Sequence, residues 1–114
     1  MIIEKVVNEY LQEALEMDEV YNEDPDGIEP PYVVIEKTGA GQENLINRST
    51  LAIKSYGASL YETILLNDQV KAAMDEIDSV ILQISDSSLD SDYDYSDTAK
   101  KRYRYQAVYN LIHY

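Results

Sequence analysis

The chain has 114 residues, of which 45% are hydrophobic, so it can form one domain around one core. Its net charge of −13 opposes non-specific binding to nucleic acid, because Lys and Arg supply most of that affinity. The absence of Cys excludes disulfides and thiolate chemistry. The N-terminal segment carries charges throughout, unlike a signal peptide or a membrane span, so we expect a cytoplasmically made protein without a membrane partner.

All 11 aromatic residues are Tyr. A buried Tyr must place its hydroxyl on a partner, so we expect many of these side chains at the rim of the core or at contact surfaces.

The first 31 residues predict a helix followed by an acidic loop. In Ile2–Leu15, apolar side chains recur at helical spacing and glutamates occupy the other side. Residues 18–31 form an acidic connection, and its middle, Asp24-Pro25-Asp26-Gly27, has the composition of a turn. The Pro30-Pro31 pair then favours extended backbone before the next element.

Two strands are predicted next. Tyr32–Thr38 is rich in Val and Ile, Gly39–Gly41 is predicted to be the hairpin turn, and Leu45–Tyr56 alternates as the partner strand. Residues 44–50 are largely polar, so we expect the partner strand to project beyond the core or to carry a bulge.

A second helix is predicted after Ser59, which forms a capping box with Glu62. We expect it to end near Asp78. Its predicted buried side chains are Leu60, Ile64, Leu65, Ala73, Met74 and Ile77.

The rest of the chain predicts two more strands, Val80–Ser85 and Arg102–Tyr114. Between them, the Ser/Asp-rich residues 86–98 are expected to be an extended acidic arm, a loop or a continuation of the third strand. One face of the last strand carries Tyr103, Tyr105, Ala107, Tyr109 and Leu111.

The order α-β-β-α-β-β predicts an α+β fold, in which a mixed or antiparallel four-stranded sheet packs with two helices. No domain boundary interrupts it, so residues 1–114 are expected to form a single domain.

No group of residues predicts catalysis, a cofactor or a bound metal. His113 is the only His, and we expect it to be exposed at the end of a strand. The carboxylates of Asp86–Asp97 lack the Gly and the later Glu of a calcium loop. Gly39-x-Gly41 lacks the third Gly of a dinucleotide-binding motif. Ser59 is explained by its role as a helix cap and is not interpreted as a nucleophile. We therefore predict that the protein is not an enzyme.

Charge is distributed unevenly along the chain. Glu16–Glu29 and Asp75–Asp97 hold acids and no base, whereas Lys100–Arg104 is basic. Such asymmetry favours contacts between unlike patches of neighbouring molecules. The Tyr/Arg alternation of Arg102–Tyr105 fits a strand with its Tyr face on the core, a seam between subunits or a nucleic-acid stacking surface. The predicted interface residues are Glu23, Asp24, Asp26, Tyr93, Tyr95, Lys100, Lys101, Arg102 and Arg104.

Two blocks of the chain, Pro31–Met74 and Thr98–Tyr114, carry a family resemblance. Their features are PYVVIEKTG, a second strand ending AIKSYG, the helix ASLYETILLNDQVKAAM and the ending RY-x-Y-x-x-x-Y. In these features the chain resembles the tail-terminator, or tail-completion, proteins that join tail to head in long-tailed bacteriophages.

The resemblance implies a non-enzymatic virion protein without a cofactor, assembled in the cytoplasm of the host bacterium. It implies an α+β subunit of a hexameric ring that caps the tail tube and docks to the head connector protein. DNA would pass through this ring without specific binding. We expect the basic segment Lys100–Arg104 of one subunit to meet Glu23–Glu29 or Asp86–Asp97 of its neighbour.

Two alternatives remain open from the sequence. A head–tail connector stopper, or neck protein, is also a small ring subunit. An acidic DNA-mimic inhibitor is compatible with the net charge of −13, although the acids cluster in two segments instead of covering one elongated face.

Overall fold

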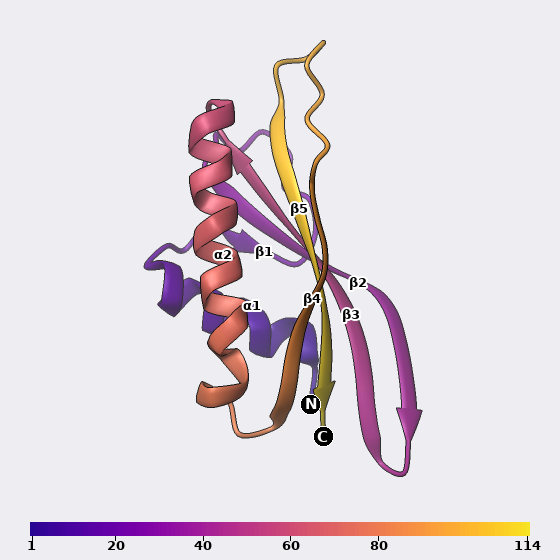
Figure 1. The fold of residues 1–114 in the computed structure, drawn as a ribbon. Coiled ribbons are helices and arrows are strands. Elements are labelled where there is room, and N and C mark those ends of the chain that lie inside the picture. Colours follow the sequence, from indigo (N-terminus) through magenta and orange to yellow (C-terminus); the bar gives the residue numbers. More distant parts are fainter.

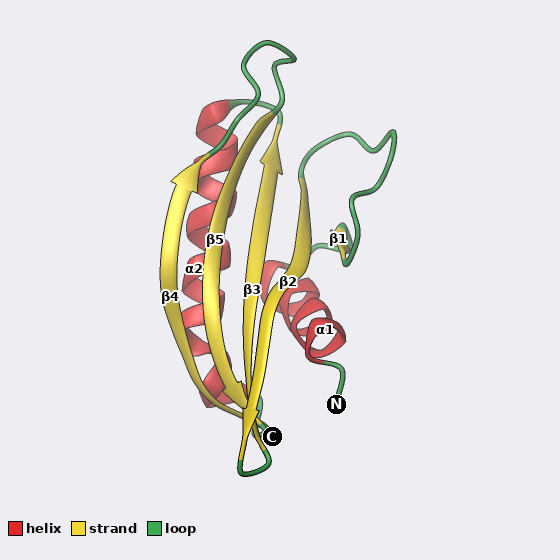
Figure 2. Ribbon diagram, turned by 90° about the vertical axis from the view of Figure 1, so that its right-hand side faces the viewer, coloured by secondary structure: helices red, strands yellow, loops and turns green.

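The computed structural model describes all 114 residues as two layers, in which both helices cover one face of a twisted sheet (Figure 1). Figure 2 shows the long strands β2 to β5 side by side, with β1 at the edge. The sheet has the order β1-β2-β3-β5-β4, with β1 parallel to β2 and the other pairs antiparallel. The elements are α1 (Ile3–Leu15), β1 (Val20–Tyr21), β2 (Tyr32–Glu43), β3 (Ile46–Gly57), α2 (Leu60–Val80), β4 (Ile84–Asp94) and β5 (Tyr103–His113).

The predicted α+β class and its two helices are confirmed, but the sheet has five strands instead of four. The additional strand, β1, lies within the segment predicted to be a loop. It has two residues, which is too short for an alternating pattern, and the burial of Val20 against the core stabilises it. None of the helices is long and apolar enough to span a membrane.

The predicted hairpin turn at Gly39–Gly41 is wrong, because these residues lie inside β2 and pair with β3. An irregularity between Lys37 and Gly39 shifts the register, and pairing then continues to Glu43 opposite Ile46. The actual turn is Asn44-Leu45, where both residues have positive φ. The polar start of β3 does project beyond the core, at the lower end of Figure 1.

Helix α2 begins as predicted and ends two residues later than expected, at Val80. The Glu62 backbone N–H donates to Ser59 Oγ at 3.2 Å, which confirms the cap. Met74 and Ile77 are buried, but Leu60 and Leu65 are exposed. The helix turns a different stripe toward the sheet, made of Thr63, Leu66, Asn67, Val70, Met74 and Ile77.

The third strand begins at Ile84 instead of Val80 and continues through the Ser/Asp-rich residues to Asp94, which is one of the three alternatives left open for that segment. Val80 ends α2 and Leu82 is 92% exposed, whereas β4 is formed by the Ser/Asp-rich residues. Pairing with β5 overrides the weak strand propensity of Ser and Asp, since strand preference depends on context. The aspartates also protect this edge of the sheet from pairing with another chain.

Strand β5 lies between β3 and β4, so its inward side chains form the middle of the core. Ala107, Tyr109 and Leu111 are buried, as the alternation predicted. His113 is also buried, contrary to expectation, because its backbone has partners in both neighbouring strands. Its Nε2 lies 2.8 Å from Ser49 Oγ.

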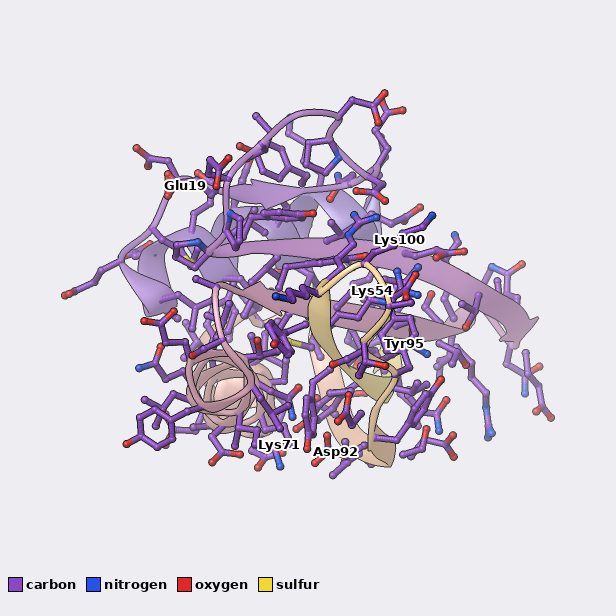
Figure 3. The ribbon with its side chains drawn as sticks, turned by 90° about the horizontal axis from the view of Figure 1, so that it is seen from above. Glu19, Lys54, Lys71, Asp92, Tyr95 and Lys100 are labelled. Carbon is purple, nitrogen blue, oxygen red and sulfur yellow. The ribbon has the colours of Figure 1, made fainter.

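A polar cluster fastens α2 to the outer strands. Asn67 Nδ2 and Lys71 Nζ donate to the two carboxylate oxygens of Asp92, at 2.8 and 2.6 Å. Figure 3 shows Lys71 and Asp92 beside each other. The Tyr109 hydroxyl donates to Asp75 Oδ1 at 2.8 Å, so the central strand also holds the helix through a polar contact. These contacts explain why Asn67 is buried in an otherwise apolar stripe.

We predict that Gly57→Ala destabilises the protein by about 1–3 kcal/mol, because the added methyl group overpacks this site. A Cβ at position 57 would lie 2.7 Å from the backbone N of Thr63, in the first turn of α2. Gly41→Ala is the matched control, since nothing lies within 4 Å of its added Cβ. Urea unfolding of both variants measures the difference, and equal stabilities would contradict the close approach.

A second prediction concerns alkaline pH. Burial, followed by the hydrogen bond to Asp75, raises the pKa of Tyr109 above its ordinary value of 10.0. The hydrogen bond to Asp92 is the largest of the effects that raise the pKa of Lys71. Both groups therefore hold their protons more tightly in the folded than in the unfolded chain. Their contribution to stability is complete below the unfolded pKa values and is lost as the pH rises through the folded ones.

Tyr109→Phe should lower the free energy of unfolding by about 1–3 kcal/mol at neutral pH, because a hydrogen bond to a charged group is lost. It should also make the loss of stability above pH 10 shallower. Tyr61→Phe is the control, because Tyr61 is 71% exposed. Urea unfolding at a series of pH values tests this, and an unchanged alkaline slope in Tyr109→Phe would contradict it.

Candidate functional site

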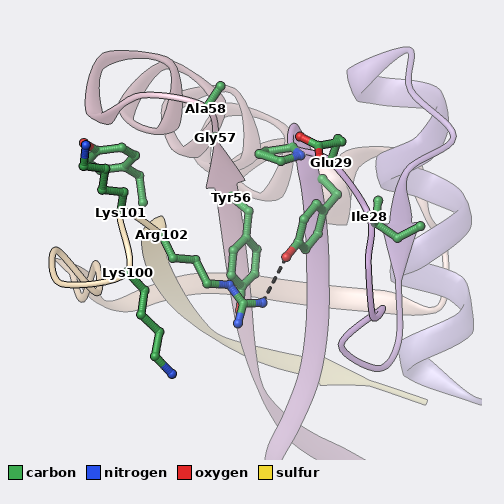
Figure 4. Close-up of a pocket in the computed structure, with 11 residues that line it drawn as sticks. Ile28, Glu29, Tyr56, Gly57, Ala58, Lys100, Lys101 and Arg102 are labelled. Atoms are coloured by element: carbon green, nitrogen blue, oxygen red, sulfur yellow. Dashed lines mark hydrogen bonds between the residues drawn. The ribbon is translucent and has the colours of Figure 1, made fainter.

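A surface pocket of about 390 Å³ lies at the end of the molecule where β4 turns into β5 (Figure 4). Three segments far apart in the sequence form its walls: residues 28–32, 56–58 and 100–103. We call this the basic pocket, and its lining residues are Ile28, Glu29, Pro30, Tyr32, Tyr56, Gly57, Ala58, Lys100, Lys101, Arg102 and Tyr103.

The basic pocket is built on a small second core. Tyr32, Val34 and Tyr56 form a buried cluster on the sheet face opposite the helices, since they alternate with the residues of the main core. The rings of Tyr32 and Tyr56 stack with their centroids 4.5 Å apart. This stacked aromatic pair forms the base on which Arg102 lies.

Arg102 closes one side of the pocket and makes three contacts within the chain. Its Nη2 donates to the Tyr32 hydroxyl at 3.0 Å, as Figure 4 shows, and lies 3.2 Å from Asp24 Oδ1. Its guanidinium carbon stands 4.8 Å from the centroid of the Tyr56 ring. Arg102 therefore joins the acidic connection to β2 and β3.

Arg104 is also satisfied within the chain. Its guanidinium carbon lies 4.4 Å from the centroid of the Tyr95 ring, and its Nε donates to the Tyr95 carbonyl at 2.9 Å. Tyr93 packs edge-on against Tyr95, with ring centroids 6.0 Å apart. Burial raises the pKa of the Tyr95 hydroxyl above its ordinary value of 10.0. The Tyr/Arg pattern thus forms a stacked group along the β4–β5 hairpin.

Lys100 and Lys101 differ from the two arginines because they lie at the exposed tip of the β4–β5 turn. The turn is closed by paired backbone hydrogen bonds of 2.9 Å between Asp97 and Arg102. It holds both lysines beside the basic pocket, with Glu29 as the one carboxylate in its wall. They make no ion pair within the chain, which is also true of the exposed Lys5 and Arg48 elsewhere in the fold.

The structure brings together only some of the predicted interface residues. Asp24 and Arg102, which were expected to pair between neighbouring subunits, pair within one chain. Glu23 and Asp26 are exposed in the connection that carries Asp24. Tyr32, Tyr56 and Ile28 were missed, because their positions in the pocket depend on strand pairing and on the path of a loop.

The side chains that line the basic pocket offer a partner several kinds of contact. The pocket offers cations, phenolic hydroxyls and an apolar wall, and no nucleophile paired with a base lies in it. No group of His, Cys, Asp and Glu side chains in the structure is arranged to hold a metal ion.

The chain matches no model of a known protein family and no curated protein.

We predict that Arg102→Ala lowers the free energy of unfolding by about 1–2 kcal/mol, through the combined loss of its ring, hydroxyl and carboxylate contacts. Lys101→Ala is the matched control and should change stability by less than about 0.5 kcal/mol, as is usual for an exposed side chain. Chemical denaturation compares the two variants. If both were equally stable, Arg102 would not fasten the acidic connection.

Proposed function

We propose that this protein is a non-enzymatic phage virion subunit that forms a ring on the end of the tail tube and joins the tail to the head. The observation that supports this proposal best is the separation of unlike surfaces on one small subunit. Lys100 and Lys101 stand exposed at one end of a chain whose net charge is −13. Contacts between unlike faces of identical subunits are heterologous, and they generate closed rings when the rotation closes.

The same charge suits controlled assembly. Free subunits with a net charge of −13 repel one another, which keeps them apart in solution. A tail tube would overcome this repulsion by supplying a template of binding sites. The partners in this proposal are the tail-tube protein, the head connector protein and other copies of the chain, which form a hexamer on the tail.

The family resemblance lies in segments that organise the fold. Its first block covers β2, β3 and most of α2, and its second block covers the β4–β5 turn and β5. A role in the virion would use these elements as a rigid scaffold and the exposed ends as contact surfaces. A connector stopper would use the same kind of scaffold, so the experiment must separate the two roles.

Tail tubes that lack their terminator test the proposal directly. We expect the purified protein to bind one end of these tubes as a ring visible by electron microscopy, and to make them competent to join heads. Heads lacking tails are the control, because a stopper would bind their connector without any tail. Failure to bind tubes, together with competition against DNA for a restriction enzyme, would favour a DNA mimic and contradict the proposal.

A further inference from the structure

The tip of the β2–β3 hairpin carries an apolar side chain where the fold does not require one. Asn44 and Leu45 form the two-residue turn with φ of 51° and 67°. Gly suits the second position of such a turn, whereas a bulky residue at positive φ is a strained exception. Leu45 is also 83% exposed, so it contributes little to the core of its own chain. A strained and exposed Leu indicates a role outside the isolated subunit.

The neighbours of Leu45 complete a small contact surface. Ile46 is 42% exposed, and Glu43 presents an exposed carboxylate on the other side of the turn. We call Glu43–Ile46 the hairpin tip. It combines apolar side chains with one negative charge, and the exposed Arg48 lies beside it on β3.

The hairpin tip and the basic pocket lie at opposite ends of the molecule, whose longest dimension is 46 Å (Figure 1). The two surfaces are complementary in chemistry. The pocket has Ile28 in its apolar wall, and Lys100 and Lys101 at its rim. Its volume of about 390 Å³ is ample for a leucine side chain. Its cations outnumber the single carboxylate of Glu29, so an acidic insert is favoured.

We propose that the hairpin tip of one copy inserts into the basic pocket of the next, with Leu45 in the pocket and Glu43 against Lys100 and Lys101. The occupant is therefore a second copy of this chain, bound head to tail. This contact gives the proposed ring its subunit interface, and in that respect it rests on the proposed function.

The absence of Cys allows a direct test by crosslinking. A variant with Asn44→Cys and Ala58→Cys keeps Leu45 and places one thiol on the hairpin tip and one in the pocket wall. These sites lie at opposite ends of one chain, so disulfides can join them only between copies. Oxidation should yield a ladder of covalent oligomers. The control pairs Asn44→Cys with Gln69→Cys, an exposed site on α2, and should give no ladder beyond dimers.

The Leu45→Gly variant distinguishes an effect on self-association from an effect on the stability of the subunit. Gly suits the positive φ, so this variant should be at least as stable as the parent chain. We nevertheless expect its self-association to weaken by about tenfold or more, because the central apolar anchor is lost. Glu43→Lys and Lys101→Glu should each weaken association, and their combination should recover it at least partly. Light scattering over a concentration series, with and without tail tubes, measures these changes.

The outcomes distinguish this contact from the proposed function. A protein that caps tails but forms no ladder, either free or bound to tubes, would overturn the contact and leave the function standing. A ladder from a protein that never binds tubes would support the contact and contradict the virion role. Unchanged association in Leu45→Gly would overturn the assignment of Leu45 as the anchor.

Discussion

The structure depends on the central position of strand β5 beneath helix α2. This strand pairs with β3 on one side and β4 on the other, and its inward side chains form the middle of the core. Tyr109 contributes both an apolar ring and a hydroxyl that reaches Asp75 on the helix. Because a buried hydroxyl without a partner is costly, this contact fixes the position of α2 as well as stabilising it. The Asp92 contacts with Asn67 and Lys71 extend the same arrangement to the edge strand.

That one-sided packing leaves the long strands free to extend past the helices. The β2–β3 hairpin projects at one end of the sheet and the β4–β5 hairpin at the other (Figure 1). The two ends have different chemistry, since one presents Leu45 and the other presents Lys100 and Lys101. A subunit with two unlike ends is suited to head-to-tail association, whereas a symmetric dimer would need one self-complementary patch.

The tertiary structure also shows which basic residues stabilise the subunit and which are exposed to a partner. The chain has 9 basic and 22 acidic residues, and ion pairs within the chain occupy four of the nine, namely Lys37, Lys54, Lys71 and Arg102. Arg102 and Arg104 lie on aromatic rings and hold the chain together, so reversing their charge would damage the subunit as well as any interface. Lys100 and Lys101 lack this structural role and are better probes of assembly.

The sequence by itself determined the features that depend on local periodicity and capping. The two helices, the Ser59 cap, the first hairpin and the buried face of β5 follow from patterns within a few residues of one another. Tertiary structure alone decided the turn at Asn44-Leu45, the choice of a strand among the three alternatives for the Ser/Asp residues of β4, and the burial of His113. The turn and β4 depend on the register in which each strand pairs with the next one along the chain, and the burial of His113 also depends on Asn47 of the distant strand β3. In each case the backbone hydrogen bonds of the sheet outweigh local preference. The basic pocket could not be predicted from the sequence, because its three walls come from distant segments that only the folded chain brings together.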